Sequence, residues 1–219
     1  MKKTLILVVV MLFVATSAFA GIVGSKHDLR AAPYIGATMS ACQYCHTPHN
    51  PVAAAAPLWN KTLPAGPYTM YVLTNPGGNI GAAPGSASLT CLTCHDGTLN
   101  IGDVVTGTSD VITDAGGVLD ANGLLTSGAN LTTDLRTTHP IGVVYDTGRA
   151  YLTAIDGAAA PNGVDQYVRD GKKWKIYGGS EDVGTVECAS CHNPHNTTAG
   201  QTPFLKDTKN TMCTDCHGE

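Results

Sequence analysis

Four copies of the pattern Cys-x-x-Cys-His constrain this chain more strongly than any other feature of its sequence. They begin at Cys42, Cys91, Cys188 and Cys213 and use all eight cysteines of the 219-residue chain. Two cysteines three residues apart can each form a thioether with one vinyl group of the same haem, and the histidine that follows can ligate the iron. The pattern therefore predicts four covalently attached haem c groups.

The residues that this prediction assigns fall into two sets. The thioether residues are Cys42, Cys45, Cys91, Cys94, Cys188, Cys191, Cys213 and Cys216. The proximal iron ligands are His46, His95, His192 and His217. A zinc knuckle, a redox-active Cys-x-x-Cys pair or a disulfide framework would use the same cysteines, but none of them requires a histidine after each second cysteine.

The histidine count predicts the remaining iron ligands. The chain has eight histidines, so four are left after the proximal ligands: His27, His49, His139 and His195. Two histidines per iron is the economical assignment, with Met39, Met70 and Met212 as alternative axial ligands. His49 follows His46 by three residues across Pro48, so the two imidazoles cannot easily reach opposite faces of one ring. We therefore expect His49, and likewise His195, to ligate a haem attached elsewhere.

The amino terminus predicts export. Residues 1–20 have a basic start, an apolar run and an Ala-x-Ala cleavage pattern before Gly21, as in a signal peptide that is removed. No second stretch is long and apolar enough to predict a membrane span. The net charge of −4 becomes more negative once Lys2 and Lys3 leave with the leader. This balance argues against nucleic acid as a partner, because binding it needs a basic surface.

Composition predicts a chain that depends on its haems for a core. Glycine (25) and proline (12) are plentiful and phenylalanine (3) is scarce. We expect a mostly irregular fold with short α-helices and few short β-strands, organised around four stacked covalent haems. Without haem the chain should be largely unfolded, because ordering a loop-rich backbone is entropically costly.

An internal repeat predicts two dihaem units, 21–137 and 138–219, within one haem-wrapped domain. Each unit has an early histidine, a Cys-x-x-Cys-His-x-Pro-His-Asn motif and a second attachment motif. Further local expectations are a strand at 68–73, a helix beginning near Ser86 or Ser88 and a surface elaboration at 99–137. We also expect irregular chain from Pro140 to Tyr177, with a basic hairpin or exposed strand at 169–177.

The motifs at Cys42–Asn50 and Cys188–Asn196, with His27-Asp28-Leu29 and the segment from Thr138 to Gly142, resemble those of OmcE-like tetrahaem cytochromes that polymerise into extracellular conductive filaments. The resemblance runs from His27 to His217. It implies a chain of haems continuous between subunits, in which one iron takes a histidine from the neighbouring copy. Carried onto this sequence, the donor would be one of His27, His49, His139 or His195. We favour His27, on an N-terminal arm that could reach the haem site near the C-terminus.

The sequence thus predicts an electron-transfer protein rather than an enzyme, since every iron can be filled on both faces. It would form a head-to-tail homopolymer at the cell surface and exchange electrons with other redox proteins or extracellular acceptors. The alternatives are a soluble periplasmic shuttle with the same haems and a multihaem reductase.

Overall fold

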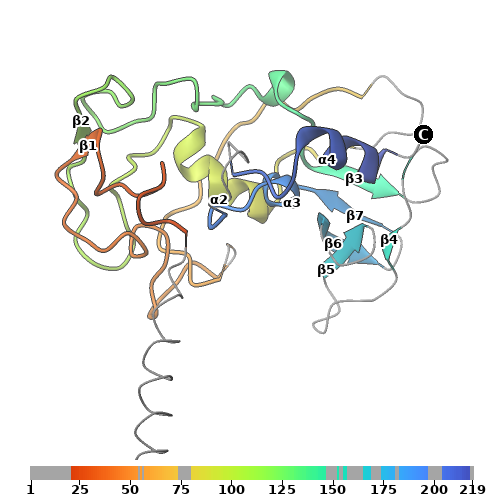
Figure 1. Cartoon of the computed structure of the whole chain (residues 1–219), viewed down its shortest axis with the longest axis horizontal. Helices are drawn as coiled ribbons and strands as arrows, with labels where there is room; N and C mark the ends of the chain where they lie inside the picture. Colours follow the sequence, from red (N-terminus) through yellow and green to blue (C-terminus); the bar gives the residue numbers. More distant parts are fainter. Residues whose placement is uncertain are drawn as a thin grey trace, which may run out of the picture.

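The chain is mostly irregular, as predicted, with short helices and strands at intervals (Figure 1). The structure is a computed structural model that describes residues 21–53, 55, 57–73, 80–146, 152, 155–156, 165–168, 174–180, 183–196 and 204–217. Within these ranges, no helix has the length and hydrophobicity needed to cross a membrane. The leader predicted at 1–20 and the basic residues Lys172 and Lys173 lie outside the described residues.

The α-helices carry attachment motifs. Helix α2 (Ser86–His95) holds the whole second motif, whereas α3 (Cys188–Cys191) and α4 (Lys209–Cys216) hold the third and fourth motifs except for their final histidines. The predicted start of α2 near Ser86 is confirmed. Helical backbone suits these motifs because side chains three residues apart lie on one face, so both thiols of a pair point the same way.

Two antiparallel sheets lie at opposite ends of the molecule, with α2 and α3 between them (Figure 1). The smaller pairs β1 (Tyr34–Ile35) with β2 (Thr113–Asp114). The larger has the order β3-β7-β6-β5-β4. Its strands are β3 (Val143–Asp146), β4 (Ile155–Asp156), β5 (Asp165–Val168), β6 (Trp174–Ser180) and β7 (Val183–Val186).

The sheets differ from the sequence-based expectations in two places. The segment beginning at Pro140 supplies most of the five-stranded sheet instead of irregular chain, and Trp174 and Ile176 are buried where an exposed strand was expected. Residues 68–73 form no strand, and Thr69 makes only an isolated bridge with Asp134. Strand pairing depends on partners distant in sequence, which local composition does not reveal.

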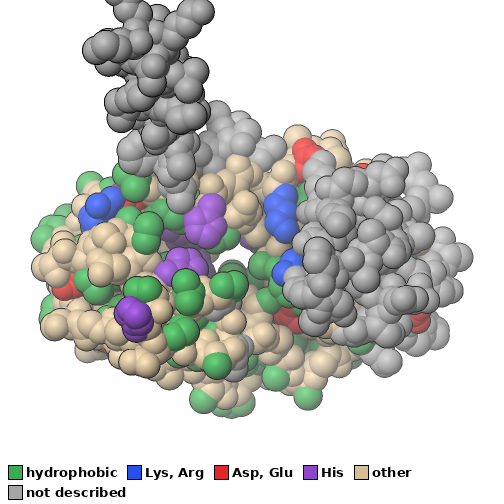
Figure 2. Space-filling model, turned by 90° about the horizontal axis from the view of Figure 1, so that it is seen from below, with side chains coloured by type: hydrophobic (Ala, Val, Ile, Leu, Met, Phe, Trp, Pro, Cys, Tyr) green, Lys and Arg blue, Asp and Glu red, His purple; other side chains and the backbone are tan. Residues whose placement is uncertain are grey.

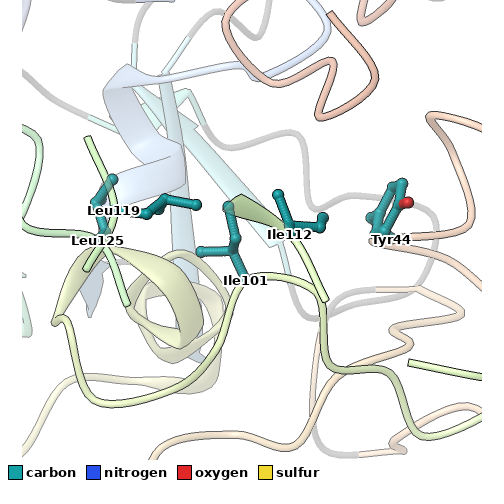
Figure 3. Packing of buried hydrophobic residues seen from close by; sticks show 5 residues of the cluster. All are labelled: Tyr44, Ile101, Ile112, Leu119 and Leu125. Atoms are coloured by element: carbon teal, nitrogen blue, oxygen red, sulfur yellow. The ribbon is translucent and has the colours of Figure 1, made fainter. Parts of the chain in front are cut away.

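The largest apolar cluster contradicts the expected surface role of residues 99–137. Ile101, Ile112, Leu119 and Leu125 are buried in a row with Tyr44 (Figure 3), and Cys45 and Cys94 pack against this cluster. The short apolar runs of the segment are separated by turn residues, so each contributes one side chain to the core. The segment therefore forms part of the wall around the first two attachment motifs. A 3-10 turn, η1 (Leu135–Thr137), ends it.

Helices α2 and α3 join the two halves of the chain. Ser88 in α2 donates its hydroxyl hydrogen to Glu187 and accepts the backbone N–H of Cys188 at 2.9 Å. Both Ser88 and Glu187 are buried. This polar contact brings the second and third attachment motifs together.

Candidate haem sites

We number the sites 1 to 4 by their attachment motifs, which end at His46, His95, His192 and His217. At site 2, the ring of His27 lies nearly perpendicular to that of His95, with the centroids 6.0 Å apart and the planes at 75°. His27 arrives from the N-terminal arm, where Asp28 is held by Arg30 through a 2.8 Å ion pair. Burial, and then the charges of His95 and His195, lower the pKa of His27 to about 4. The imidazole is therefore neutral at physiological pH, which is the form that binds a metal.

At site 1, the ring of His46 lies nearly parallel to that of His195, with 6.2 Å between centroids and 17° between planes. The backbone N–H of His195 donates to the Asn193 side chain at 3.0 Å, which fixes the turn that presents the ring. Burial is the main cause that lowers the pKa of His195, and the charge of His46 adds to it.

Backbone carbonyls orient the proximal histidines. His46 Nδ1 lies 2.9 Å from the Pro57 carbonyl oxygen, and His95 Nδ1 lies 2.8 Å from that of Ala129. Because a carbonyl can only accept, each Nδ1 carries the proton and each Nε2 keeps its lone pair for a metal. A backbone partner has no sequence signature, so these anchors could not be predicted.

The two histidine pairs have the spacing that an iron between them requires. Metal–nitrogen bonds of about 2 Å, with about 1 Å more to each ring centre, place the centroids of two opposed imidazoles about 6 Å apart. His27 Nδ1 is buried without a hydrogen-bond partner in the described part of the chain. On the face seen in Figure 2, histidine side chains gather beside a hollow. The residues present therefore fit a haem at each of sites 1 and 2.

Site 3 is a pocket bounded by its own attachment motif and by His139. Cys188, Cys191 and His192 line it together with His139. Apolar side chains complete the wall: Leu131, Leu135, Ile141 and Val186. His139 Nδ1 lies 3.0 Å from the Pro140 carbonyl oxygen, which leaves Nε2 for a metal. An apolar pocket with two thiols and two imidazoles matches the chemistry of a haem c site.

Site 4 lies at the end of α4 and is the most open. Its Cys213 and His217 are exposed, while the Cys216 carbonyl accepts a 3.1 Å hydrogen bond from the Tyr145 hydroxyl. The ring of His49 is also exposed. Within the described ranges, neither His217 nor His49 contacts another histidine ring. The structure thus brings six of the eight predicted iron ligands into three groups and leaves these two apart.

Thiols of successive motifs are neighbours. Cys91 and Cys188 hydrogen-bond one another, which raises the pKa of Cys91. Burial raises the pKa of Cys45 to about 11, with a smaller contribution from the nearby Cys94. Cys216 is likewise raised to about 12 by burial and then by Cys191. None of the eight cysteines forms a disulfide.

The chain segment after each Pro-His-Asn motif folds back in the same way in both halves. The N–H of Thr47 donates to the Leu58 carbonyl at 2.7 Å, and that of Asn193 donates to the Phe204 carbonyl at 2.8 Å. Leu58 and Phe204 both have a positive φ, 58° and 57°. The duplicated sequence pattern therefore corresponds to a duplicated backbone conformation.

Residues 181–219 match the family model of the doubled CXXCH motif. The match indicates a multihaem c-type cytochrome. The paired motifs indicate covalent haem c and electron transfer as its chemistry. No curated protein matches the chain.

Some residues at these sites were not predicted. Tyr68 donates to Asp96, the residue after His95, at 2.6 Å, and burial followed by this bond raises the pKa of Tyr68. Lys61 lies in the wall between the first two motifs. Both belong to segments that the sequence suggested were extended loop or strand, so no local signal marked them.

Proposed function

We propose that the protein holds four bis-histidine haems and conducts electrons as the polymerising subunit of an extracellular cytochrome filament. The observation that carries the proposal is the pairing of His46 with His195 and of His95 with His27 at the spacing of a bis-histidine iron. When bound, each haem accepts and releases one electron. The paired histidine side chains would supply both axial ligands of an iron, which would leave it no open coordination position.

The geometry supports an assignment for three sites, and elimination supplies the fourth. Site 1 uses His46 and His195, site 2 uses His95 and His27, and site 3 uses His192 and His139. His217 of site 4 and His49 are the two that remain. We infer that His49 of one copy completes site 4 of the next.

This assignment replaces the sequence-based expectation that His27 acts between subunits. His27 lies beside His95 and is largely buried, so it is already engaged within its own chain. His49 is exposed and stands on the site 1 motif, whereas site 4 lies near the C-terminus. A contact between two different surfaces of the same molecule is heterologous, and it produces an open filament when the rotation does not close.

Saturated axial positions favour electron transfer over catalysis. A haem that reduces a small molecule needs a free coordination position. The neighbouring thiols of successive motifs support close haem spacing, which electron passage requires. The leader predicted before Gly21 supports export, and we propose the cell surface as the destination.

The test compares His49→Ala with His27→Ala in protein purified with its haems. Both variants keep every attachment residue, so both should retain four haems by mass. His49→Ala should abolish filaments in electron micrographs, whereas His27→Ala should still polymerise while its site 2 binds carbon monoxide. Normal filaments from His49→Ala would contradict the trans assignment. Only discrete particles from the wild-type chain would support a periplasmic shuttle instead.

A further inference from the structure

Lys61 is a buried lysine in the wall between sites 1 and 2. Its exposed fraction is 2%. Its ammonium donates to the carbonyl oxygens of Ile101 at 2.7 Å and Asp103 at 2.6 Å. Lysine is almost never fully buried unless something compensates its charge, so this position calls for an explanation.

The surroundings of Lys61 are the first two attachment motifs. The N–H of the preceding residue, Asn60, donates to the Cys45 carbonyl at 2.9 Å. Ile101, whose carbonyl accepts from Lys61, belongs to the apolar cluster against which Cys45 and Cys94 pack. One residue thus borders the thioether positions of two different haems.

No carboxylate neutralises this ammonium within the part of the chain that the structure describes. The ion pairs found there join Arg30 with Asp28 and Arg136 with Asp134. Two carbonyl dipoles solvate the cation but leave its unit charge in place. In a medium of low effective dielectric such a charge acts over a longer range than on the surface.

The Lys61 charge lies close to both motifs. Its carbonyl partner Ile101 belongs to the apolar cluster against which Cys45 and Cys94 pack. A fixed positive charge in the wall of a haem site favours the reduced iron, because the site gains one unit of negative charge when the ferric iron accepts an electron.

We propose that Lys61 is a redox-tuning residue that raises the reduction potentials of the haems at sites 1 and 2. The inference rests on the proposed haem attachment at these motifs. The balanced step is the transfer of one electron from a neighbouring reduced haem to the ferric iron at site 1 or 2. The Lys61 charge would stabilise the product of this step.

The experiment is a spectroelectrochemical titration of the purified holoprotein. Lys61→Met keeps the side-chain length and removes the charge. We expect the reduction equilibria of two of the four haems to weaken about tenfold, which is about 59 mV for a one-electron couple. Lys209→Met removes the same charge from an exposed position on α4 and should shift the potentials much less, because water screens it.

Further variants separate charge from shape. Lys61→Arg should restore the wild-type potentials, whereas Lys61→Gln, which keeps a donor for one carbonyl, should lower them as Lys61→Met does. If Lys61→Met does not fold with its haems, the reduction potentials of Lys61→Gln provide the test instead. If the Lys61 variants are less stable but keep the wild-type reduction potentials, the proposal is overturned and Lys61 has a purely structural role. A wild-type mass that lacks haem at the first two motifs would instead overturn the proposed haem assignment.

Discussion

The imidazole rings of His46 and His195 lie nearly parallel, 6.2 Å apart, although they belong to opposite halves of the chain. His195 follows His192 of the third motif by three residues. On the proposed assignment, the haem of site 1 would be attached through one half and its iron ligated by a histidine of the other. This relationship makes the two predicted dihaem units interdependent.

Replacing His195 should open site 1 without detaching its haem. His195→Ala leaves all eight cysteines in place, so the mass should still show four haems. The reduced protein should bind about one equivalent of carbon monoxide, because one coordination position is vacated. His195→Met should keep six-coordinate iron and raise one potential, since methionine ligation raises it relative to histidine. Failure of His195→Ala to bind carbon monoxide would remove His195 from site 1.

Asp110 should make the protein sensitive to acid. Its carboxylate accepts from the Thr38 hydroxyl at 2.7 Å and the Thr38 N–H at 2.8 Å, and also from the Tyr44 hydroxyl. The Thr38 hydroxyl is the largest cause that lowers the pKa of Asp110 to about 2 from 3.8. A lowered folded pKa stabilises the fold fully above 3.8, and this contribution disappears as the pH falls towards 2.

The measurement is the free energy of unfolding of the holoprotein as the pH is lowered. The difference between wild type and Asp110→Asn should shrink between about pH 4 and pH 2. Both proteins lose histidine ligation in acid, so this loss cancels when one free energy of unfolding is subtracted from the other. Asp103→Asn, which removes the same charge from an exposed side chain, is the matched control. A difference for Asp110→Asn that does not change between pH 4 and pH 2 would refute the anchoring role.

The contact between α2 and α3 should be measurable through Ser88. Ser88→Ala removes the bond to Glu187 and the acceptor of the Cys188 N–H, both in buried surroundings. We expect a loss of about 1–3 kcal/mol in the free energy of unfolding, because buried polar groups lose partners. Ser86→Ala, at the exposed start of the same helix, should change little. Equal effects of the two substitutions would argue against a buried polar link between the halves.

Tyr145 should stabilise the helix that carries site 4. Tyr145→Phe removes only the hydroxyl that donates to the Cys216 carbonyl at 3.1 Å. The expected cost is about 0.5–1.5 kcal/mol, with faster hydrogen exchange in α4. Tyr71→Phe, which removes an exposed hydroxyl, is the matched control. Unchanged exchange in α4 would show that the bond does not hold the helix.

The attachment residues and the loop-rich character of the fold could be predicted because they depend on local sequence. The start of α2 followed in the same way from the polar residues Ser86 and Ser88. The histidine pairs could not be predicted, since counting ligands does not say which rings meet. His27 illustrates this limit: its position on a terminal arm favoured a contact between subunits, and the structure of a single copy places its ring beside that of His95. The burial of Ile101 and Ile112 likewise depends on Tyr44, which is distant in sequence.

The proposed construction of site 1 from both halves of the chain would also set an order of events during biogenesis. If the predicted leader directs export from the amino terminus, the first motif would leave the cytoplasm long before residue 195. Its haem would then be attached while the opposite face of the iron still lacked an imidazole from the chain, and that face would stay reactive until the later part of the protein arrived. A truncated product would in that case be recognisable by an iron with an open coordination position.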